Sequence, residues 1–325
     1  MVRNWLITGG CGFIGTSLVE RVLQEQSDVH IRILDNLSVG TKKDLAEVCD
    51  FSEVTVDQLD TEAGVFLVTG DIRDAEVSLD AGQNMECIVH LAANTGVGPS
   101  VEDPRADMEA NIIGIFNMLE SARLNKVRQF VFASSGAPAG VVEPPIHEEM
   151  APHPVSPYGA SKLAGEGYCS SYYQTFGINT VSLRFGNVYG PRSKKKSSVV
   201  AKFIRQALNG EICEIYGDGS QTRDFIYIAD LIDAVIKASE FEGGGEIFQI
   251  AAGSELTLNE LVKEMKQIFD EQTGLNMQIK HGEKRLGDVL RNYSDTSKAR
   301  DVLGWQVSTP LKQGLKLTVA DLMQA

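Results

Sequence analysis

The sequence predicts an α/β protein, with a doubly wound parallel sheet and a smaller, partly interleaved α/β domain toward the C-terminus. A buried-strand pattern at the N-terminus runs into a glycine-rich turn and a helical pattern, and strands and helices alternate from there onward. The 325 residues exceed what one hydrophobic core usually holds, so two lobes are expected. We expect the first at residues 1–186 plus about 224–252, and the second at about 187–223 plus 253–325.

Composition and charge exclude several classes of protein. The net charge of −14 disfavours nucleic acid and anionic membranes as partners. No apolar run approaches the ~18 residues of a membrane span, and the N-terminus leads into a strand pattern without a signal peptide. The five cysteines are scattered without Cys-x-x-Cys spacing, which favours reduced thiols, a cytoplasmic location and no metal site.

The first strand pattern, Trp5–Thr8, leads into residues 9–15, Gly-Gly-Cys-Gly-Phe-Ile-Gly, and a helix over Thr16–Gln24. This order of strand, glycine turn and helix is the context that a dinucleotide fingerprint requires. Glycine lets the backbone approach a pyrophosphate, and the helix N-terminus attracts its negative charge. Glycine turns also occur between strands and helices without any ligand, so the motif alone is weak evidence. In this context it indicates a Rossmann-like domain.

The second strand pattern, Ile31–Leu34, ends at Asp35, twenty residues beyond Gly15. A carboxylate at this position would accept hydrogen bonds from an adenosine ribose diol and would repel a 2′-phosphate, so NAD is favoured over NADP. Shortly after the third strand pattern, Val65–Thr69, Asp71 could face an adenine amino group. Both aspartates could instead be cap or turn residues.

Two further strand patterns end in candidate site residues. Cys87–His90 opens onto the small residues Leu91–Ala93, where a cofactor could pass the strand ends, and Gln129–Ala133 opens onto Ser134 and Ser135. His90 lies in an apolar run. We interpret it as a buried histidine with satisfied hydrogen bonds, and not as a ligand.

Tyr158 and Lys162 lie four residues apart at the start of a helical pattern that continues to about Phe176. Four residues make about one helical turn, so the phenol and the ammonium share one face. A cation beside a tyrosine favours the phenolate and lowers a pKa that is about 10 in water, which makes the tyrosine a better base. Taken alone, such a pair is better explained as two surface residues. The NAD motif upstream and Ser135 shift the balance toward an acid–base pair.

The remaining patterns continue the alternation of helices and strands. Helices are expected at Asp107–Arg123, Val199–Asn209, Ala229–Glu240 and Leu258–Phe269, and strands at Thr180–Phe185, Glu214–Tyr216, Asp224–Ile228 and Glu246–Ile250. The run Lys194-Lys195-Lys196 is better explained as a solvated loop than as a phosphate clamp.

Several short motifs occur in a fixed order: residues 8–15, Asp35-Asn36, Gly70-Asp71-Ile72, residues 90–93, Tyr158 to Lys162, Arg223-Asp224-Phe225 and the tail Arg285-x-Gly-Asp. The ordered set resembles the extended short-chain dehydrogenase/reductases that modify nucleotide sugars, over essentially the whole chain. Within that group the chain most resembles the UDP-hexose 4-epimerases, which act on UDP-glucose or UDP-N-acetylglucosamine.

The resemblance implies an NAD-dependent nucleotide-sugar epimerase. Tyr158 would act as general base on the sugar 4-hydroxyl, Lys162 would bind the nicotinamide ribose and keep the tyrosine partly ionised, and Ser135 would hydrogen-bond the same hydroxyl. A hydride would pass from sugar carbon 4 to NAD and return to the other face of a 4-keto intermediate. NAD would stay tightly bound, held by Gly9, Gly12, Phe13, Ile14, Gly15, Asp35, Asn36, Asp71, Ile72, Leu91, Ala92 and Ala93, together with Tyr158 and Lys162.

The resemblance also assigns residues to the nucleotide sugar. Asn187 would lie near the diphosphate, Tyr216 would pack against the base, and Arg223 and Arg285 would bind the diphosphate, which suits a guanidinium fork. Asn292 matches the family residue that controls the space around the sugar 2-substituent. Because asparagine is smaller than tyrosine, an N-acetylated sugar would fit there.

The loop after Ser135 departs from the family pattern. Where the family usually continues with a small residue, a threonine, another residue and Tyr-Gly, this chain has Gly136-Ala137-Pro138-Ala139-Gly140, which leaves the sugar and the reaction type open. The related 4,6-dehydratases and UDP-glucuronate decarboxylases usually carry a glutamate in this loop, so its absence disfavours both. A non-catalytic NAD-binding sensor or scaffold is a further alternative, which the retained Ser135, Tyr158 and Lys162 disfavour.

In the family, the helices that correspond to Asp107–Arg123 and Tyr158–Phe176 pair across a dimer interface, so we expect a homodimer. The expected partners are therefore a nucleotide sugar, NAD and a second copy of the chain.

Overall fold

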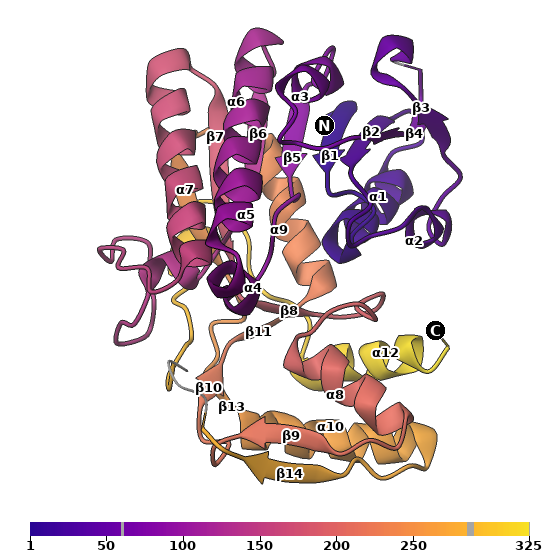
Figure 1. Ribbon diagram of the computed structural model, residues 1–325, viewed down its shortest axis with the longest axis vertical. Helices are drawn as coiled ribbons and strands as arrows, with labels where there is room; N and C mark the ends of the chain where they lie inside the picture. Colours follow the sequence, from indigo (N-terminus) through magenta and orange to yellow (C-terminus); the bar gives the residue numbers. More distant parts are fainter. Residues whose placement is uncertain (60–61, 285–288, 325) are drawn as a thin grey trace. The chain divides into compact units, whose positions relative to one another are not determined.

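The computed structural model describes residues 1–59, 62–284 and 289–324. Contacts divide the chain into two units (Figure 1). Unit 1 comprises Met1–Val141, Glu148–Arg184 and Ile232–Phe248, and unit 2 comprises Val142–His147, Phe185–Leu231 and Gln249–Ala325. Segments of the two units alternate along the chain. Contacts assign residues 142–147, 185–186, 224–231 and 249–252 to unit 2, whereas the sequence-based division placed them in the first domain.

Unit 1 is built on an eight-stranded sheet. In spatial order its strands are β12 (Glu246–Ile250), β7 (Asn179–Phe185), β6 (Gln129–Ser135), β5 (Cys87–His90), β1 (Asn4–Thr8), β2 (His30–Asp35), β4 (Gly64–Thr69) and β3 (Ser52–Val54). The pairings of β1 with β2 and β5, of β4 with β2 and β3, and of β5 with β6 are all parallel. Every residue of β2 is buried, as expected for a strand covered on both faces.

The strand order confirms the doubly wound sheet. The chain starts at β1, moves outward through β2 to the edge strand β3, and comes back to β4 between them. It then crosses to β5 on the other side of β1 and continues through β6 and β7. Sheets of this kind bind ligands outside the carboxyl ends of the strands, at the point where the order reverses. Residues 9–15 follow β1 and Leu91–Ala93 follow β5, so both candidate cofactor segments lie at this switch point.

One face of the sheet is covered by three helices that share a hydrophobic cluster with the strands. The helices are α3 (Ala75–Ala81), α6 (Gly114–Leu124) and α7 (Pro157–Phe176), and the strand residues in the cluster include Leu6, Ile88 and Phe130. The alternate strand residues, such as Ile7 and Ile33, point to the opposite face because side chains alternate along a strand.

Helix α1 (Phe13–Glu25) follows the glycine turn and buries Leu18, Val19 and Val22. Its Arg21 forms a 2.8 Å salt bridge with Asp233 of α9 (Ile228–Glu240).

The helix expected over Asp107–Arg123 is longer and contains a π-helical turn. Helix α5 (Pro104–Met108) continues through the π-turn Glu109–Ile113 into α6. Asp103 caps α5 by accepting a hydrogen bond from Ala106 N at 3.0 Å, and Pro104 occupies the first helical position, where no backbone donor is lost. Helix α7 lies beside this long helix and contacts both α5 and α6 (Figure 1).

Unit 2 combines short strand pairs with helices. Strand β8 (Asn187–Tyr189) pairs in parallel with β11 (Phe225–Tyr227), β9 (Cys213–Tyr216) in parallel with β14 (Ile279–Gly282), and β10 (Thr222–Arg223) antiparallel with β13 (Leu256–Thr257). Helix α12 (Leu311–Leu322) packs against α10 (Leu258–Thr273) and α8 (Val199–Leu208).

The C-terminal part of unit 2 is anchored by Asp230. After α11 (Ser297–Asp301), Trp305 Nε1 donates to the Asp230 carbonyl oxygen at 2.8 Å. The Asp230 carboxylate accepts hydrogen bonds from the backbone of Ser308 at 3.0 Å and of Thr309 at 3.1 Å. One buried acidic residue therefore fixes the segment that leads into α12.

The remaining short elements of the described chain are α2 (Lys42–Ala46), α4 (Val97–Glu102) and the 3-10 turns Val56–Gln58 and Ala137–Ala139. All five cysteines, each among the described residues, are free thiols. Over the described ranges, no helix combines the length and the apolarity that crossing a membrane demands.

Candidate active site

The glycine turn approaches the end of β5 so closely that side chains are excluded. Gly9 has a φ of +69°, and a Cβ there would lie 2.9 Å from Ala92 N. A Cβ on Gly15 would lie 2.4 Å from Gly9 O. Glycine alone tolerates both the positive φ and this contact. The turn thus exposes its backbone at the switch point.

Helix α1 begins where this turn ends. Gly12 is the N-cap, and Phe13 and Ile14 form the start of the first turn without a side-chain cap. A helix N-terminus that follows a glycine turn at a sheet switch point is the arrangement that binds a pyrophosphate. The residues present therefore fit a dinucleotide.

His90 is a buried, hydrogen-bonded residue, as the sequence indicated. Its Nδ1 lies 2.9 Å from Thr8 Oγ1, which also accepts a hydrogen bond from Ala92 N at 3.1 Å. Burial, with a smaller effect of the Lys162 charge, lowers the pKa of His90 to about 3, so the ring is neutral near pH 7. It ties the ends of β1 and β5 together beneath the candidate cofactor site.

Asp35 lies at the end of β2, beside the glycine turn. Its two carboxylate oxygens accept hydrogen bonds from Cys11 N at 2.9 Å and Leu37 N at 2.8 Å. Burial raises the pKa of Asp35, and these two bonds oppose the rise. Because each carboxylate oxygen can accept a second hydrogen bond, the residue also fits a ribose diol.

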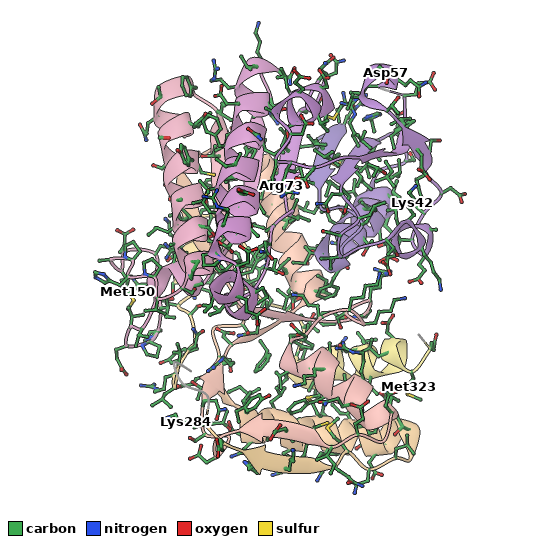
Figure 2. All side chains as sticks on the ribbon, in the orientation of Figure 1. Lys42, Asp57, Arg73, Met150, Lys284 and Met323 are labelled. Carbon is green, nitrogen blue, oxygen red and sulfur yellow. The ribbon has the colours of Figure 1, made fainter. Side chains whose placement is uncertain are left out.

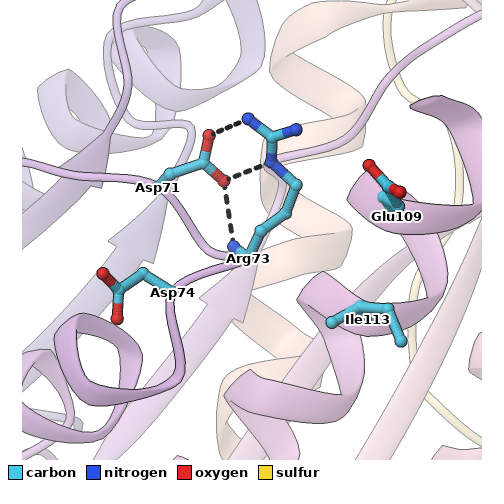
Figure 3. Close-up of a pocket in the computed structure, with 5 residues that line it drawn as sticks. All are labelled: Asp71, Arg73, Asp74, Glu109 and Ile113. Carbon is cyan, nitrogen blue, oxygen red and sulfur yellow. Dashed lines mark hydrogen bonds and ion pairs between the residues drawn. The ribbon is translucent and has the colours of Figure 1, made fainter.

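Asp71 lines a surface pocket of about 490 Å³, together with Arg73, Asp74, Glu109 and Ile113 (Figure 3). Arg73, labelled in Figure 2, donates from Nε to Asp71 Oδ1 at 3.0 Å and from Nη2 to Oδ2 at 2.8 Å. These bonds hold the pKa of Asp71 well below its ordinary value.

The hydrogen-bonding capacity of Asp71 is already used. Besides the two bonds from the Arg73 side chain, the carboxylate accepts one from Arg73 N at 2.9 Å and one from Asn36 Nδ2 at 3.0 Å. A carboxylate accepts about four hydrogen bonds. An adenine amino group could therefore bind Asp71 only if one of these donors moves aside. The neighbouring Ile72 is buried.

Ser135, Tyr158 and Lys162 come together in unit 1. Ser135 is the last residue of β6, and Tyr158 lies in the first turn of α7, which Ser156 caps by accepting a hydrogen bond from Gly159 N at 3.1 Å. The Ser135 side chain is close enough to the Tyr158 phenol to lower its pKa. Lys162 Nζ lies 5.9 Å from the centroid of the Tyr158 ring. The sequence-predicted trio is thus one cluster.

Burial sets the electrostatics of this cluster. It raises the pKa of Tyr158, an effect that the Ser135 side chain opposes. It lowers the pKa of Lys162 to about 8, against the opposing carboxylates of Asp107 and Glu166. Lys162 Nζ donates to Ala133 O at 2.9 Å. The ammonium is therefore charged at neutral pH and fixed in position, as required to stabilise a phenolate.

A buried ion pair that the sequence pattern did not single out supports the cluster. Glu166, one turn beyond Lys162 on α7, accepts hydrogen bonds from Arg184 Nε and Nη2, each at 2.8 Å, and from Ser134 Oγ at 2.6 Å. The Arg184 and Glu166 side chains are 3% and 2% exposed. The pair joins α7, β6 and β7 next to Ser135.

Asp224 organises the segments of unit 2 that carry predicted substrate residues. Its carboxylate accepts hydrogen bonds from the backbone of Ala252 at 2.8 Å and of Gly253 and Ser294 at 3.1 Å. Burial raises its pKa to about 6, and these bonds oppose the rise. Its carbonyl oxygen accepts a hydrogen bond from Asn187 Nδ2 at 3.0 Å. Four separate segments meet at this residue.

Arg223 and Asn292 lie on adjoining segments of unit 2. Arg223 Nη1 donates to the carbonyl oxygens of Thr222 and Val289, each at 2.7 Å, and Asn292 N donates to Thr222 Oγ1 at 3.2 Å. These contacts fix the position of the Arg223 guanidinium relative to Asn292.

Tyr216, the last residue of β9, is partly buried, and Lys202 Nζ of α8 lies 5.9 Å from the centroid of its ring. Arg285, the other predicted diphosphate residue, lies outside the described residues. The binding roles of the five unit 2 residues stay predictions.

The fold and the site together define the class: an α/β protein with a dinucleotide site and a serine–tyrosine–lysine cluster. Residues 5–251 match the model of the NAD dependent epimerase/dehydratase family. The chain is 37% identical over 322 residues to the UDP-glucose 4-epimerase of Mycolicibacterium smegmatis, and this covers 97% of this chain and 96% of that one. The chain therefore belongs to the NAD dependent epimerase/dehydratase family.

Solved structures agree over the full length. The UDP-glucose 4-epimerase of Thermotoga maritima with UDP-glucose has a TM-score of 0.87 and 34% identity, with 99% of both chains covered. The UDP-glucose 4-epimerase of Thermus thermophilus in complex with NAD has a TM-score of 0.85 and 33% identity, again with 99% of both chains covered.

Proposed function

We propose that this protein is an NAD-dependent nucleotide-sugar 4-epimerase that acts on a UDP-hexose or a UDP-N-acetylhexosamine. The observation that carries the proposal is the cluster of Ser135, Tyr158 and Lys162, which lies in the same unit as the glycine turn and Asp35. Membership of the NAD dependent family and the full-length similarity to UDP-glucose 4-epimerases support it.

NAD, when bound, would accept the hydride from sugar carbon 4 and return it. Tyr158 would take the proton of the sugar 4-hydroxyl, and Ser135, which lies beside Tyr158, would hold that hydroxyl in line. The Lys162 ammonium would stabilise the phenolate. Return of the hydride to the opposite face of the 4-keto sugar would give the other stereoisomer, without net redox.

The cofactor contacts follow the geometry of the switch point. The pyrophosphate would bind the backbone of Gly9, Gly12 and Gly15 and the first turn of α1, and Asp35 would bind the adenosine ribose. The contacts proposed around the adenine and the nicotinamide come from a further set of residues: Phe13, Ile14, Asn36, Asp71, Ile72, Leu91, Ala92 and Ala93.

In unit 2, Arg223 and Arg285 would bind the diphosphate, with Asn187 beside it. Tyr216 would stack on the base, and Asn292 would leave space for a 2-N-acetyl group. The fixed position of the Arg223 guanidinium supports this assignment, because a guanidinium held by two carbonyl oxygens loses little freedom when an anion binds.

The alternative reactions of the family need an acid or base beside Ser135. Gly136 and the 3-10 turn Ala137–Ala139 offer no carboxylate. The first carboxylate after Ser135 in the sequence, Glu143, forms an ion pair with Arg291. A 4,6-dehydratase or a decarboxylase is therefore a weaker candidate than an epimerase.

The test is to incubate the purified protein with UDP-glucose, UDP-N-acetylglucosamine, UDP-glucuronate and dTDP-glucose, without added NAD, and to resolve the products by chromatography and NMR. Stereoisomers of unchanged mass support the epimerase, whereas loss of water or carbon dioxide would replace it. Tyr158→Phe should abolish turnover while NAD stays bound. Tyr168→Phe, which removes a phenol hydroxyl from the exposed face of the same helix, should leave turnover intact.

We further propose a cytoplasmic homodimer. The free thiols support the location.

The outer face of α6 and α7 exposes the apolar side chains of Phe116 (39%), Tyr168 (38%) and Phe176 (50%), and the rings of Phe116 and Tyr168 are in edge contact with centroids 5.9 Å apart. Exposed apolar side chains that gather on one face in this way support an interface between chains. Sedimentation should give a dimer mass at micromolar concentration that Phe116→Glu reduces to a monomer. A wild-type protein that sediments only as a monomer would contradict the proposal.

A further inference from the structure

Lys162 carries a charge in a buried site, and such a charge needs compensation. Its side chain is 3% exposed, and besides the Tyr158 ring it contacts the carbonyl oxygen of Ala133 at 2.9 Å and the ring of Phe132, whose centroid lies 4.8 Å from Nζ. Neither contact carries a negative charge. An isolated buried ammonium is strongly disfavoured unless an anion lies nearby.

Two buried carboxylates act on Lys162, and one of them already has a cation. Both Asp107 and Glu166 raise the pKa of Lys162, and Asp107 has the larger effect. Both oxygens of Glu166 are bound by Arg184, at 2.8 Å each, and Oε1 also accepts the hydroxyl of Ser134. Arg184 therefore balances the charge of Glu166.

Asp107 is held differently. It is 1% exposed and lies on α5, where Oδ1 accepts a hydrogen bond from Asn111 Nδ2 at 2.9 Å, and the same amide nitrogen donates to Ser161 Oγ of α7 at 3.2 Å. Asn111 occupies the π-turn, and its amide also bonds the backbone of Asn94 at 2.8 Å in both directions. Ser161 directly precedes Lys162 on α7. These hydrogen-bond partners are neutral, so they orient the carboxylate without balancing its charge.

The other titratable groups that face Lys162 contribute no charge near neutral pH. Burial raises the pKa of the Cys169 thiol on α7 to about 12, so it stays protonated. Burial lowers the pKa of His90 on β5 to about 3, so it stays neutral. Tyr158 is the proton acceptor itself. Burial raises the pKa of Asp107, and the Lys162 charge opposes this rise, so each group favours the charged form of the other. Asp107 is thus the carboxylate that is available to the lysine.

We propose that Asp107 is the counter-ion and positioning residue of the Tyr158–Lys162 pair, held in place by Asn111 and Ser161. This inference rests on the proposed roles of Tyr158 and Lys162 in proton transfer. Asp107 acts through these two residues and does not itself touch the substrate.

Removal of the Asp107 charge should move both groups in the same direction. Without the anion, charged Lys162 is less stable, so its pKa falls below about 8. The same anion disfavours the phenolate of Tyr158, so the pKa of Tyr158 falls as well. The whole bell-shaped pH–rate profile should therefore shift to lower pH, not merely decrease in height.

The experiment titrates Lys162 by NMR in the purified, NAD-bound enzyme labelled with ¹³Cε-lysine, with Lys162→Arg used to assign the signal. Asp107→Asn retains hydrogen-bonding groups for Asn111 and Ser161 but loses the charge, and it should lower the pKa of Lys162 by about one pH unit or more. Asp107→Glu should restore most of the wild-type value. Glu102→Gln removes an exposed carboxylate from the preceding helix and should leave it unchanged.

An unchanged pKa of Lys162 in Asp107→Asn would overturn the proposal, even if turnover decreased, because a merely structural role changes activity without changing this titration. Should Asp107→Asn not fold, Asp107→Ser gives the same test. A shifted lysine pKa without epimerase activity in the wild type would support the counter-ion role and refute the proposed function. The two failures are therefore distinguishable.

Discussion

The ion pair of Glu166 and Arg184 should contribute strongly to the stability of unit 1, and Glu166→Gln tests this. The substitution preserves shape but leaves the Arg184 guanidinium, 3% exposed, without its two 2.8 Å carboxylate contacts. Arg184 Nη1 is already buried without a hydrogen-bond partner, so no second acceptor compensates. Removal of one partner of a buried pair costs about 3–5 kcal/mol, since an unpaired charge stays in the interior.

The measurement is urea unfolding followed by the fluorescence of Trp5, which is buried in β1, in a Trp305→Phe background so that the signal reports on unit 1 alone. Glu166→Gln should lower the free energy of unfolding by about 3–5 kcal/mol. The double variant Glu166→Gln/Arg184→Met should lose less than the single variant, because the buried cation is then gone as well. As a control, Glu25→Gln breaks an exposed ion pair with Arg21 and should lower the free energy of unfolding by less than about 1 kcal/mol.

Two results would refute this reasoning. If the double variant is as unstable as Glu166→Gln, the penalty does not come from an unpaired arginine but from lost packing. If Glu166→Gln lowers the free energy of unfolding no more than Glu25→Gln does, the buried ion pair stabilises unit 1 no more than an exposed pair. Either outcome would also weaken the claim that Arg184 balances the charge of Glu166 beside Lys162.

Three further predictions follow from the site and from Asp224. Turnover should fall above about pH 8, because Lys162 loses its proton there. In a pH–rate profile, Lys162→Arg should abolish this alkaline limb, because arginine has a pKa of at least ~12 and stays charged. An alkaline limb at the same pH in the variant would assign the limb to another group. Gly15→Ala should lose bound NAD, measured by absorbance after denaturation, because the new Cβ would lie 2.4 Å from Gly9 O. Gly98→Ala should retain NAD, because no atom lies within 4 Å of a Cβ at that position. Equal NAD contents in the two variants would contradict the close approach at Gly15. In the native state Asp224 keeps its proton up to about pH 6, whereas the unfolded chain releases it near pH 3.8. The contribution of Asp224 to the free energy of unfolding is therefore largest below pH 3.8 and falls by roughly 3 kcal/mol as the pH rises to about 6. Asp224→Asn should flatten the dependence, measured by Trp305 fluorescence, and an unchanged slope would show that another group causes it.

The features that could be predicted from the sequence are local in the chain. The glycine turn, Asp35 at the end of β2, and the spacing of Tyr158 and Lys162 each need only one strand or helix to be recognised, and the structure places them as expected. In unit 2 the sequence predicted β9 and β11, whereas β10 and β13 escaped prediction because they have two residues each, too few for a periodic pattern. The π-turn within the long helix could not be predicted either, because five residues show no spacing of apolar residues that differs from the α-helical spacing on both sides.

The buried partners of the cluster could not be predicted for a different reason. Glu166 and Arg184 are 18 residues apart, and Asp107 and Ser161 lie on helices that are adjacent only after folding. In the sequence, each reads as an ordinary charged or polar residue. Their role depends on burial, which decides whether a carboxylate is a solvated surface group or the counter-ion of a lysine.

The loop after Ser135 limits which reactions the chain can complete. Once a 4-keto sugar has formed, elimination of water needs a further acid or base close to the ring, and loss of carbon dioxide needs an acid that protonates the resulting enolate. Return of the hydride needs only the groups that removed it. Gly136 and Ala137 have no proton to give, and Glu143 is held by Arg291. With Ser135, Tyr158 and Lys162 as the proton-handling residues of the cluster, reduction of the ketone is the step that this chemistry supports, and reduction from the opposite face is epimerisation.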